Sequence, residues 1–77
     1  MKMKEFNVGA KLRIAGFAES GRPYRQKLLA MGLRKGAEFE LVRKAPLGDP
    51  MEIKIGTFNL SLRKDEADAL EIEGVKP

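Results

Sequence analysis

The chain has 77 residues, enough for one small domain (residues 1–77), with a formal net charge of +4 and neither cysteine nor histidine. This composition excludes disulfides and cysteine zinc sites, and it removes the usual general base near neutral pH and the commonest nitrogen ligand of transition metals. No apolar run is long enough to span a bilayer, and Met1 to Gly9 lacks the apolar core of a signal peptide, so we expect a cytoplasmic protein without membrane insertion.

The first predicted strand covers residues 11–14, where Leu12 and Ile14 alternate with charged residues. A period of two is typical of a strand with one buried and one solvated face. Gly16 follows at a position where we expect a bulge or a sharp bend. Residues 1–7 show no such pattern, and we expect them to be frayed.

A short helix is predicted over residues 23–31, because Pro23 at the first helical position would lose no useful hydrogen-bond donor. Apolar side chains at helical spacing form one stripe along this segment: Tyr24, Leu28, Leu29 and Met31. Gly32 suits the left-handed residue that follows a helix, and Leu33 would then contact Leu28, as is common in glycine caps. A helix this short is unstable alone in water, so it must pack on the rest of the domain.

Residues 22–35 contain no acid and carry five basic side chains: Arg22, Arg25, Lys27, Arg34 and Lys35. A basic face of this kind can steer a protein toward acidic partners, nucleic acid or an anionic membrane surface. It is also what an ordinary solvated helix surface looks like, and composition alone favours this second interpretation.

The next predicted strand covers residues 37–42, in which Ala37, Phe39 and Leu41 share the buried face. A loop over residues 45–50 follows.

This loop contains two prolines, Pro46 and Pro50, which fix much of its backbone, while Gly48 permits a turn. Leu47 lies between the prolines without a strand pattern that would bury it. A rigid loop with an apolar tip is a plausible docking element. The sequence alone rather favours an inter-strand turn in which Leu47 folds back onto the end of the barrel.

The strongest local prediction is a β-hairpin of residues 51–55 and 58–62, in which apolar and polar side chains alternate. Only Gly56 and Thr57 separate the two strands, with glycine first, as a type II′ turn prefers. This turn predicts three apolar pairs on one face: Ile55 with Phe58, Ile53 with Leu60, and Met51 with Leu62. A slip of one residue would expose a whole apolar set, so the register is specified.

A short helical turn is predicted over residues 65–69, with Asp65 as its N-cap. The last predicted strand covers residues 70–73 and places Leu70 and Ile72 on its buried face. The chain is therefore predicted to be mainly β. Several short strands joined by tight turns in so few residues indicate a small barrel of five to six strands.

No catalytic set is visible, so we do not expect an enzyme or a cofactor. Without histidine or cysteine, neither serine nor any carboxylate has a recognisable partner base. Asp65 and Asp68 are weak candidates for binding a hard metal cation through oxygen. Acids at the start of a helix are also expected for the helix dipole alone, and this structural role is favoured.

Several segments resemble the FeoA family in order and spacing: residues 24–33 with Met31, Gly32 and Leu33 at their end, then Gly36, the loop Ala45-Pro46-Leu47-Gly48-Asp49-Pro50, and residues 60–67. The similarity runs from about Gly9 to Glu73 and so covers nearly the whole chain. One such segment would be weak support, but the set together is specific.

The resemblance implies an SH3-like barrel and a role in ferrous iron transport. Members of the family are cytoplasmic and work with the membrane transporter FeoB, which carries a cytosolic GTP-binding domain. On this basis we expect a protein-interaction module that docks on the cytosolic side of FeoB. The sequence leaves open whether the chain is a monomer or a weak dimer, since a small barrel with an imperfectly closed edge can self-associate. The candidate contact residues are Arg22, Arg25, Lys27, Leu47 and Asp49. The residues expected to hold the motif in shape are Met31, Gly32, Leu33, Gly36, Pro46, Gly48, Pro50 and Gly56.

A nucleic-acid-binding small β-barrel is the alternative, suggested by a sequence pI near 9.6. Barrels that bind single strands usually present aromatic side chains on which bases stack. Here Phe39 and Phe58 fall on predicted buried faces, and Phe17 and Tyr24 are expected to be packing residues. Only Phe6 is free to be exposed, so we expect no nucleic acid partner.

Overall fold

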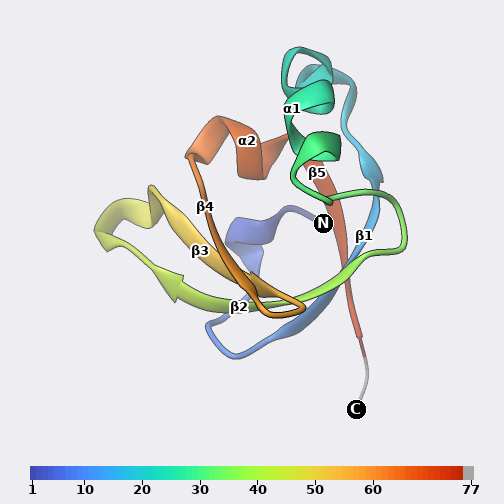
Figure 1. Cartoon of the computed structure of the whole chain (residues 1–77). Helices are drawn as coiled ribbons and strands as arrows, with labels where there is room; N and C mark the ends of the chain where they lie inside the picture. The colour runs from blue at the N-terminus through green and yellow to red at the C-terminus, as the bar shows by residue number, and fades with distance from the viewer. Residues whose placement is uncertain (76–77) are drawn as a thin grey trace.

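The computed structural model describes residues 1–75 and contains one antiparallel sheet of five strands in the order β4-β3-β2-β1-β5. The strands are β1 (Lys11–Phe17), β2 (Glu38–Lys44), β3 (Met51–Ile55), β4 (Phe58–Leu62) and β5 (Leu70–Gly74). The helical elements are the α-helices α1 (Arg25–Ala30) and α2 (Lys64–Asp68) and the 3-10 turns η1 (Met3–Glu5), η2 (Glu19–Tyr24) and η3 (Pro46–Gly48). Figure 1 shows the curved sheet with both α-helices at one end. The predicted mainly β fold is confirmed.

The sheet curves around the core, and its two edge strands do not pair with each other. Within residues 1–75 the edges are β4 and β5, and α2 connects them across the gap (Figure 1). The predicted bulge is confirmed, because the β1–β5 register shifts between Ile14 and Gly16. A second, unpredicted shift lies in β2, between Leu41 and Arg43. Bulges bend a strand and increase its twist, which suits a sheet that wraps around its core.

β3 and β4 form the predicted hairpin in the predicted register, with Ile55 opposite Phe58. Gly56 begins the turn with a φ of 60°, in the left-handed region. Thr57 does not share that region, since Leu47 is the one non-glycine residue with positive φ in the described chain. A positive φ at the first turn residue alone is the signature of a type II′ turn.

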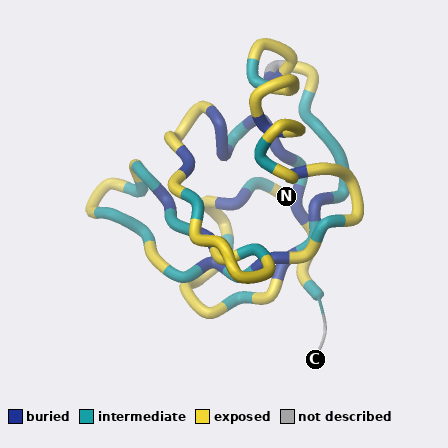
Figure 2. The backbone as a smooth tube through the Cα atoms, in the orientation of Figure 1, coloured by how far each residue is buried: buried dark blue, intermediate teal, exposed yellow. Residues whose placement is uncertain are grey.

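The tip of this hairpin extends beyond the sheet, which makes the predicted burial of Phe58 wrong. β2 pairs with β3 only as far as Lys54, so nothing from β2 lies beside the last pair of the hairpin. Met51 and Leu62 at the base are buried, whereas Phe58 at the tip is 70% exposed. Figure 2 shows the tip of the hairpin as exposed.

The N-terminal segment is packed, contrary to the expectation that residues 1–7 are frayed. Met3 is fully buried in the core. The backbones of Met1 and Ile72 exchange two hydrogen bonds: the Ile72 N–H donates at 2.7 Å and the Met1 nitrogen at 3.1 Å. The Lys2 ammonium lies 2.6 Å from the Glu71 carboxylate, and its hydrogen bond and charge lower the pKa of Glu71. The segment therefore covers the outer edge of β5.

α1 begins at Arg25, so the prediction that Pro23 occupies the first helical position is wrong. Pro23 lies in the preceding 3-10 turn η2. The apolar stripe is also narrower than predicted, since Leu28 is fully buried but Leu29 is 41% exposed.

The C-terminus of α1 has the predicted glycine cap. Gly32 has a φ of 88°, and its N–H donates to the Leu29 carbonyl at 3.0 Å. The Leu33 N–H donates to the Leu28 carbonyl, also at 3.0 Å. These two bonds define the Schellman motif, and both leucines of the second bond belong to the buried core.

α2 is capped differently from the prediction, because its N-cap is Arg63 and not Asp65. The Arg63 N–H donates to Oε1 of Glu66 at 2.9 Å. The Glu66 side chain is almost fully buried and forms an ion pair with Lys27 of α1. The hydrogen bond from Lys27 and then that from Arg63 hold the pKa of Glu66 below its ordinary value of 4.5. Glu66 thus joins both α-helices to the end of β4.

The cap of α1 predicts a specific sensitivity at Gly32. Replacing Gly32 by alanine should lower the free energy of unfolding by about 1 kcal/mol, because a side chain disfavours the left-handed conformation. No atom lies within 4 Å of a Cβ placed there, so backbone strain is the whole effect. Gly16→Ala is the control, since Gly16 has equal space and no left-handed φ. Urea unfolding that shows equal losses for the two variants would contradict this account.

The buried Glu66 predicts how stability depends on pH. Because its folded pKa is lowered, Glu66 contributes stability above about pH 4.5, and this contribution is lost as the pH falls through the folded pKa. Glu66→Gln should therefore be less stable than the wild type at about pH 7, and the difference should shrink toward about pH 3. Lys27→Met should remove part of the same pH dependence, because Lys27 is the main cause of the shift. If the difference in the free energy of unfolding between wild type and Glu66→Gln stays the same across this pH range, the Glu66–Lys27 pair contributes nothing.

Candidate docking surface

The loop of residues 45–50 presents one fully exposed apolar side chain on an ordered backbone. Its 3-10 turn η3 is closed by a hydrogen bond of 2.7 Å from the Gly48 N–H to the Ala45 carbonyl, and the Ala45 N–H donates to the Pro50 carbonyl at 3.0 Å. Leu47 has a φ of 70° and Gly48 one of 74°. The Leu47 side chain is 102% exposed relative to an extended reference, so it does not fold back onto the barrel.

The backbone of Leu47 is unusual for its residue type. A bulky residue with positive φ is a conformational outlier, and such outliers persist only when their surroundings enforce them. Here Pro46 and Pro50 restrict the loop on both sides, and the two hydrogen bonds fix its closure. The side chain gains no burial in return. No contact within residues 1–75 therefore explains a leucine at position 47.

Asp49 has a structural partner within the chain, which sequence reasoning did not foresee. Its Oδ1 accepts a hydrogen bond from the Lys64 N–H at 3.0 Å and lies 3.9 Å from the Arg63 guanidinium. Asp49 therefore fastens the loop to the start of α2, where a carboxylate is also favoured by the helix dipole. Its predicted contact with a partner protein stays a hypothesis.

The three basic candidates differ in how they are engaged. Lys27 forms the ion pair with Glu66, so much of its charge is already compensated. The Arg25 guanidinium lies 5.5 Å from the centre of the Phe17 ring, within the range of a cation–π contact. Arg22 is exposed and forms no ion pair within residues 1–75. Of these three candidates, Arg22 alone has no partner within residues 1–75 and is fully available to an acidic protein.

The structure does not bring the predicted contact residues together. Arg22 lies in η2 and both Arg25 and Lys27 in α1, whereas Leu47 belongs to the loop between β2 and β3. Figure 1 shows α2 between that loop and α1. The loop tip and the basic helix are therefore separate surface features.

The acidic candidates of α2 line a shared pocket of about 400 Å³ together with Tyr24. The Tyr24 hydroxyl lies 3.5 Å from Asp65 Oδ2, and Asp68 Oδ1 is buried without a hydrogen-bond partner in the described residues. No third acidic side chain joins them, since residues 1–75 contain no group of three metal-binding side chains. Two carboxylates fall short of the six to eight oxygen ligands that calcium requires.

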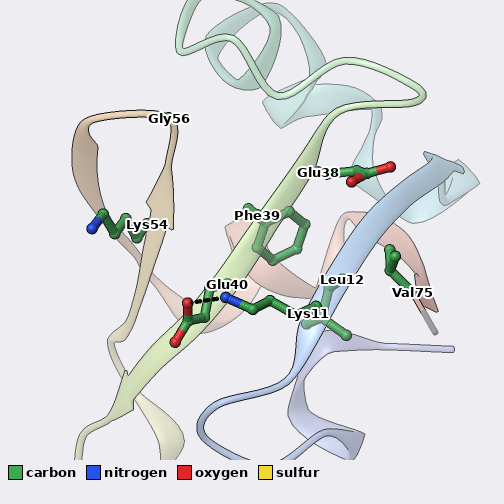
Figure 3. A pocket seen from close by; sticks show the side chains of 8 residues that line it. All are labelled: Lys11, Leu12, Glu38, Phe39, Glu40, Lys54, Gly56 and Val75. Carbon is green, nitrogen blue, oxygen red and sulfur yellow. Dashed lines mark hydrogen bonds and ion pairs between the residues drawn. The ribbon is translucent and has the colours of Figure 1, made fainter. Parts of the chain in front are cut away.

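A second pocket, of about 290 Å³, lies between β1, β2 and the hairpin tip (Figure 3). Lys11 lies 2.6 Å from the Glu40 carboxylate, and its hydrogen bond and charge lower the pKa of Glu40. Glu38 lies 3.6 Å from the Arg13 guanidinium, whereas Lys54 forms no ion pair within residues 1–75. Phe39 and Val75 add apolar surface. The pocket contains no nucleophile next to a base, so it offers no evident catalytic chemistry.

The remaining motif residues, Gly36, Met31 and Leu33, connect the helical region to the sheet and the core. Gly36 has a φ of 91°, and its N–H donates to the Ile14 carbonyl at 2.8 Å, which joins the end of the helical region to β1. Met31 is the C-cap of α1 and packs against the core together with the buried Leu33.

Sequence reasoning missed two features of the surface. The exposure of Phe58 depends on where β2 stops, and no signal in the hairpin itself shows that. The tertiary role of Glu66 had a partial signal, because a glutamate three residues after an N-cap is typical of a capping box.

In the described part of the chain no helix is long and apolar enough to cross a membrane.

Comparisons with known proteins extend this picture. The FeoA domain family matches residues 1–74. A Fe(2+) transport protein A/Fe(2+) transporter FeoB fusion protein of Porphyromonas gingivalis is 33% identical over 73 residues, which cover 95% of this chain and 8% of the fusion protein. The solution structure of iron(II) transport protein A from Clostridium thermocellum is 45% identical with a TM-score of 0.84, covering 97% of this chain and 46% of that one. This chain therefore spans less than half the length of either relative.

The fold comparison confirms the predicted SH3-like architecture. The crystal structure of Stenotrophomonas maltophilia FeoA complexed with zinc, described as a procaryotic SH3 domain protein, has a TM-score of 0.77. The similarity covers 95% of this chain and 89% of that one. Because the two sequences are only 22% identical, the match shows that the fold is shared and nothing further. The family match over nearly all of the sequence, together with the fusion relative, shows that the chain belongs to the FeoA family.

Proposed function

We propose that this chain is a cytoplasmic accessory protein of ferrous iron transport that docks on the cytosolic side of the FeoB transporter. Membership of the FeoA family supports the link to ferrous iron transport. The fusion relative supports the choice of partner, because its name joins a FeoA-type protein to FeoB in a single chain.

The observation that carries the docking mode is the geometry of Leu47. An exposed leucine on a closed loop presents apolar surface whose conformation is already fixed. Preorganisation reduces the entropy lost on binding, and a buried apolar anchor at the centre of an interface supplies much of the binding energy. The exposed Arg22 and the stacked Arg25 supply positive charge on a separate surface, where they would favour approach to an acidic partner.

Nucleic-acid binding has weaker support. The exposure of Phe58 provides one aromatic platform. Phe39 is buried, and Phe6, Phe17 and Tyr24 are partly buried against the core. Single-strand binding uses successive stacking platforms, so one exposed ring is too few.

Leu47→Asn tests the docking proposal without disturbing the fold. Asparagine tolerates the left-handed conformation and removes the apolar tip, so the free energy of unfolding should change by less than about 0.5 kcal/mol. Binding to the cytosolic domain of the transporter should weaken at least about tenfold. Ferrous iron uptake, measured under reducing conditions in cells that require the chain, should fall toward the level without it.

Leu29→Gln is the matched control, because Leu29 is another exposed leucine and lies on α1. It should leave uptake unchanged. If Leu47→Asn supports normal uptake and normal binding, Leu47 is not the anchor. If wild-type chain fails to restore uptake at all, the proposed role in transport is wrong.

A further inference from the structure

The outer edge of β4 is open and carries none of the features that usually protect a sheet edge. Such edges are commonly protected by charged residues, proline, a bulge or a covering segment. β4 reads Phe58-Asn59-Leu60-Ser61-Leu62, with no charge and no proline, and its pairing with β3 is regular. Asn59 and Ser61 are exposed.

The backbone groups available at this edge follow from the register. In an antiparallel hairpin with a two-residue loop, the residues flanking the loop exchange hydrogen bonds, and bonded pairs then alternate. Phe58, Leu60 and Leu62 therefore direct their N–H and C=O groups toward β3. Asn59 and Ser61 direct theirs outward, and no backbone hydrogen bond in residues 1–75 satisfies these groups from the outer side.

The opposite edge of the sheet, formed by β5, is protected against pairing with another strand. β5 is charged, with Glu71 and Glu73, and the N-terminal segment covers it through the Met1–Ile72 hydrogen bonds. In the described chain β4 is thus the one edge strand left free to accept another strand.

We propose that the edge of β4 binds the same edge of a second copy of this chain, antiparallel and around a two-fold axis at Leu60. Asn59 of each copy then lies opposite Ser61 of the other. Each of these two pairs exchanges two backbone hydrogen bonds between the outward N–H and C=O groups, which makes four in all. Leu60 faces Leu60, and Phe58 faces Leu62. Every apolar side chain meets an apolar one, and every polar side chain meets a polar one.

The self-complementary pattern of β4, apolar opposite apolar and polar opposite polar, favours a second copy as the occupant, and the charges on β3 do not oppose it. On the polar face of the hairpin, Lys54 lies beside Asn59, and Glu52 beside Ser61. The two-fold pairing aligns Lys54 of one copy with Glu52 of the other in the same row across the sheet. These two charges lie about three strand spacings apart, roughly 14 Å, so they attract each other little, and the paired strands themselves carry no charges that would repel.

The predicted dimer is weak. Five residues from each copy make an interface at the small end of the range for protein pairs, below about 1,200 Å². Pairing also joins the two sheets into one continuous sheet and covers the exposed Phe58. The Leu47 loop takes no part in this contact, so the inference is independent of the proposed docking function.

Sedimentation equilibrium of the 77-residue chain, up to about 1 mM, tests the pairing, because even a weak dimer is populated there. Ser61→Pro removes an outward N–H that β3 does not use, which edge strands tolerate. This variant should raise the dimer dissociation constant at least about tenfold, because the contact loses two of its hydrogen bonds. Ser61→Thr keeps the N–H and should dimerise like the wild type, as should Leu47→Asn, which changes an exposed leucine elsewhere.

Amide hydrogen exchange of the wild type gives a readout that does not depend on any variant. Protection of the Asn59 and Ser61 amides should rise with protein concentration, whereas protection of the Leu60 amide, bonded to β3, should rise much less. A chain that stays monomeric up to about 1 mM overturns the proposal and leaves the edge to a strand of another protein. A dimer that tolerates Ser61→Pro, or that forms without protecting these two amides, overturns it as well.

Discussion

The buried carboxylate of Glu66 connects elements that the sheet alone would leave apart. It accepts hydrogen bonds from the Lys27 ammonium on α1 and from the Arg63 backbone at the end of β4. At the same helix start, Asp49 ties the loop of residues 45–50 to the Lys64 N–H. A helix of five residues has little stability of its own, so α2 holds its place through these contacts and through its buried alanines. The position of α1, the loop of residues 45–50 and the connection between β4 and β5 all depend on that short segment.

Patterns among neighbouring residues predicted the structural features that depend on local sequence alone. The β3–β4 register followed from alternation and a two-residue turn, and the Gly32 cap followed from one glycine after an apolar stripe. Two errors were local, since α1 begins at Arg25 and the N-cap of α2 is Arg63. The other errors concern contacts made by distant parts of the chain. Phe58 is exposed because β2 ends its pairing at Lys54, and Lys27 is engaged by a carboxylate from α2. The N-terminal segment gave no pattern because its order comes from the edge of β5.

The candidate docking surface also combines features that the local sequence shows with features that depend on distant contacts. The sequence identified a leucine in a proline-bounded loop that no strand would bury, but it favoured Leu47 folding back onto the barrel, whereas the structure leaves it fully exposed. The role of Asp49 could not be read there, because its partner lies in α2. The two proposed contacts would need different partners: a rigid apolar tip needs a pocket, and an open strand edge needs only another extended backbone.

The left-handed backbone at Leu47 has an evolutionary consequence. Under selection for stability alone, a position with a φ of 70° would favour asparagine or glycine, which adopt that conformation at little cost. Under the proposed docking, the contact with the partner is what favours leucine over these two residues. Among descendants of this protein, the residue at position 47 should therefore record whether its contact has been kept or abandoned.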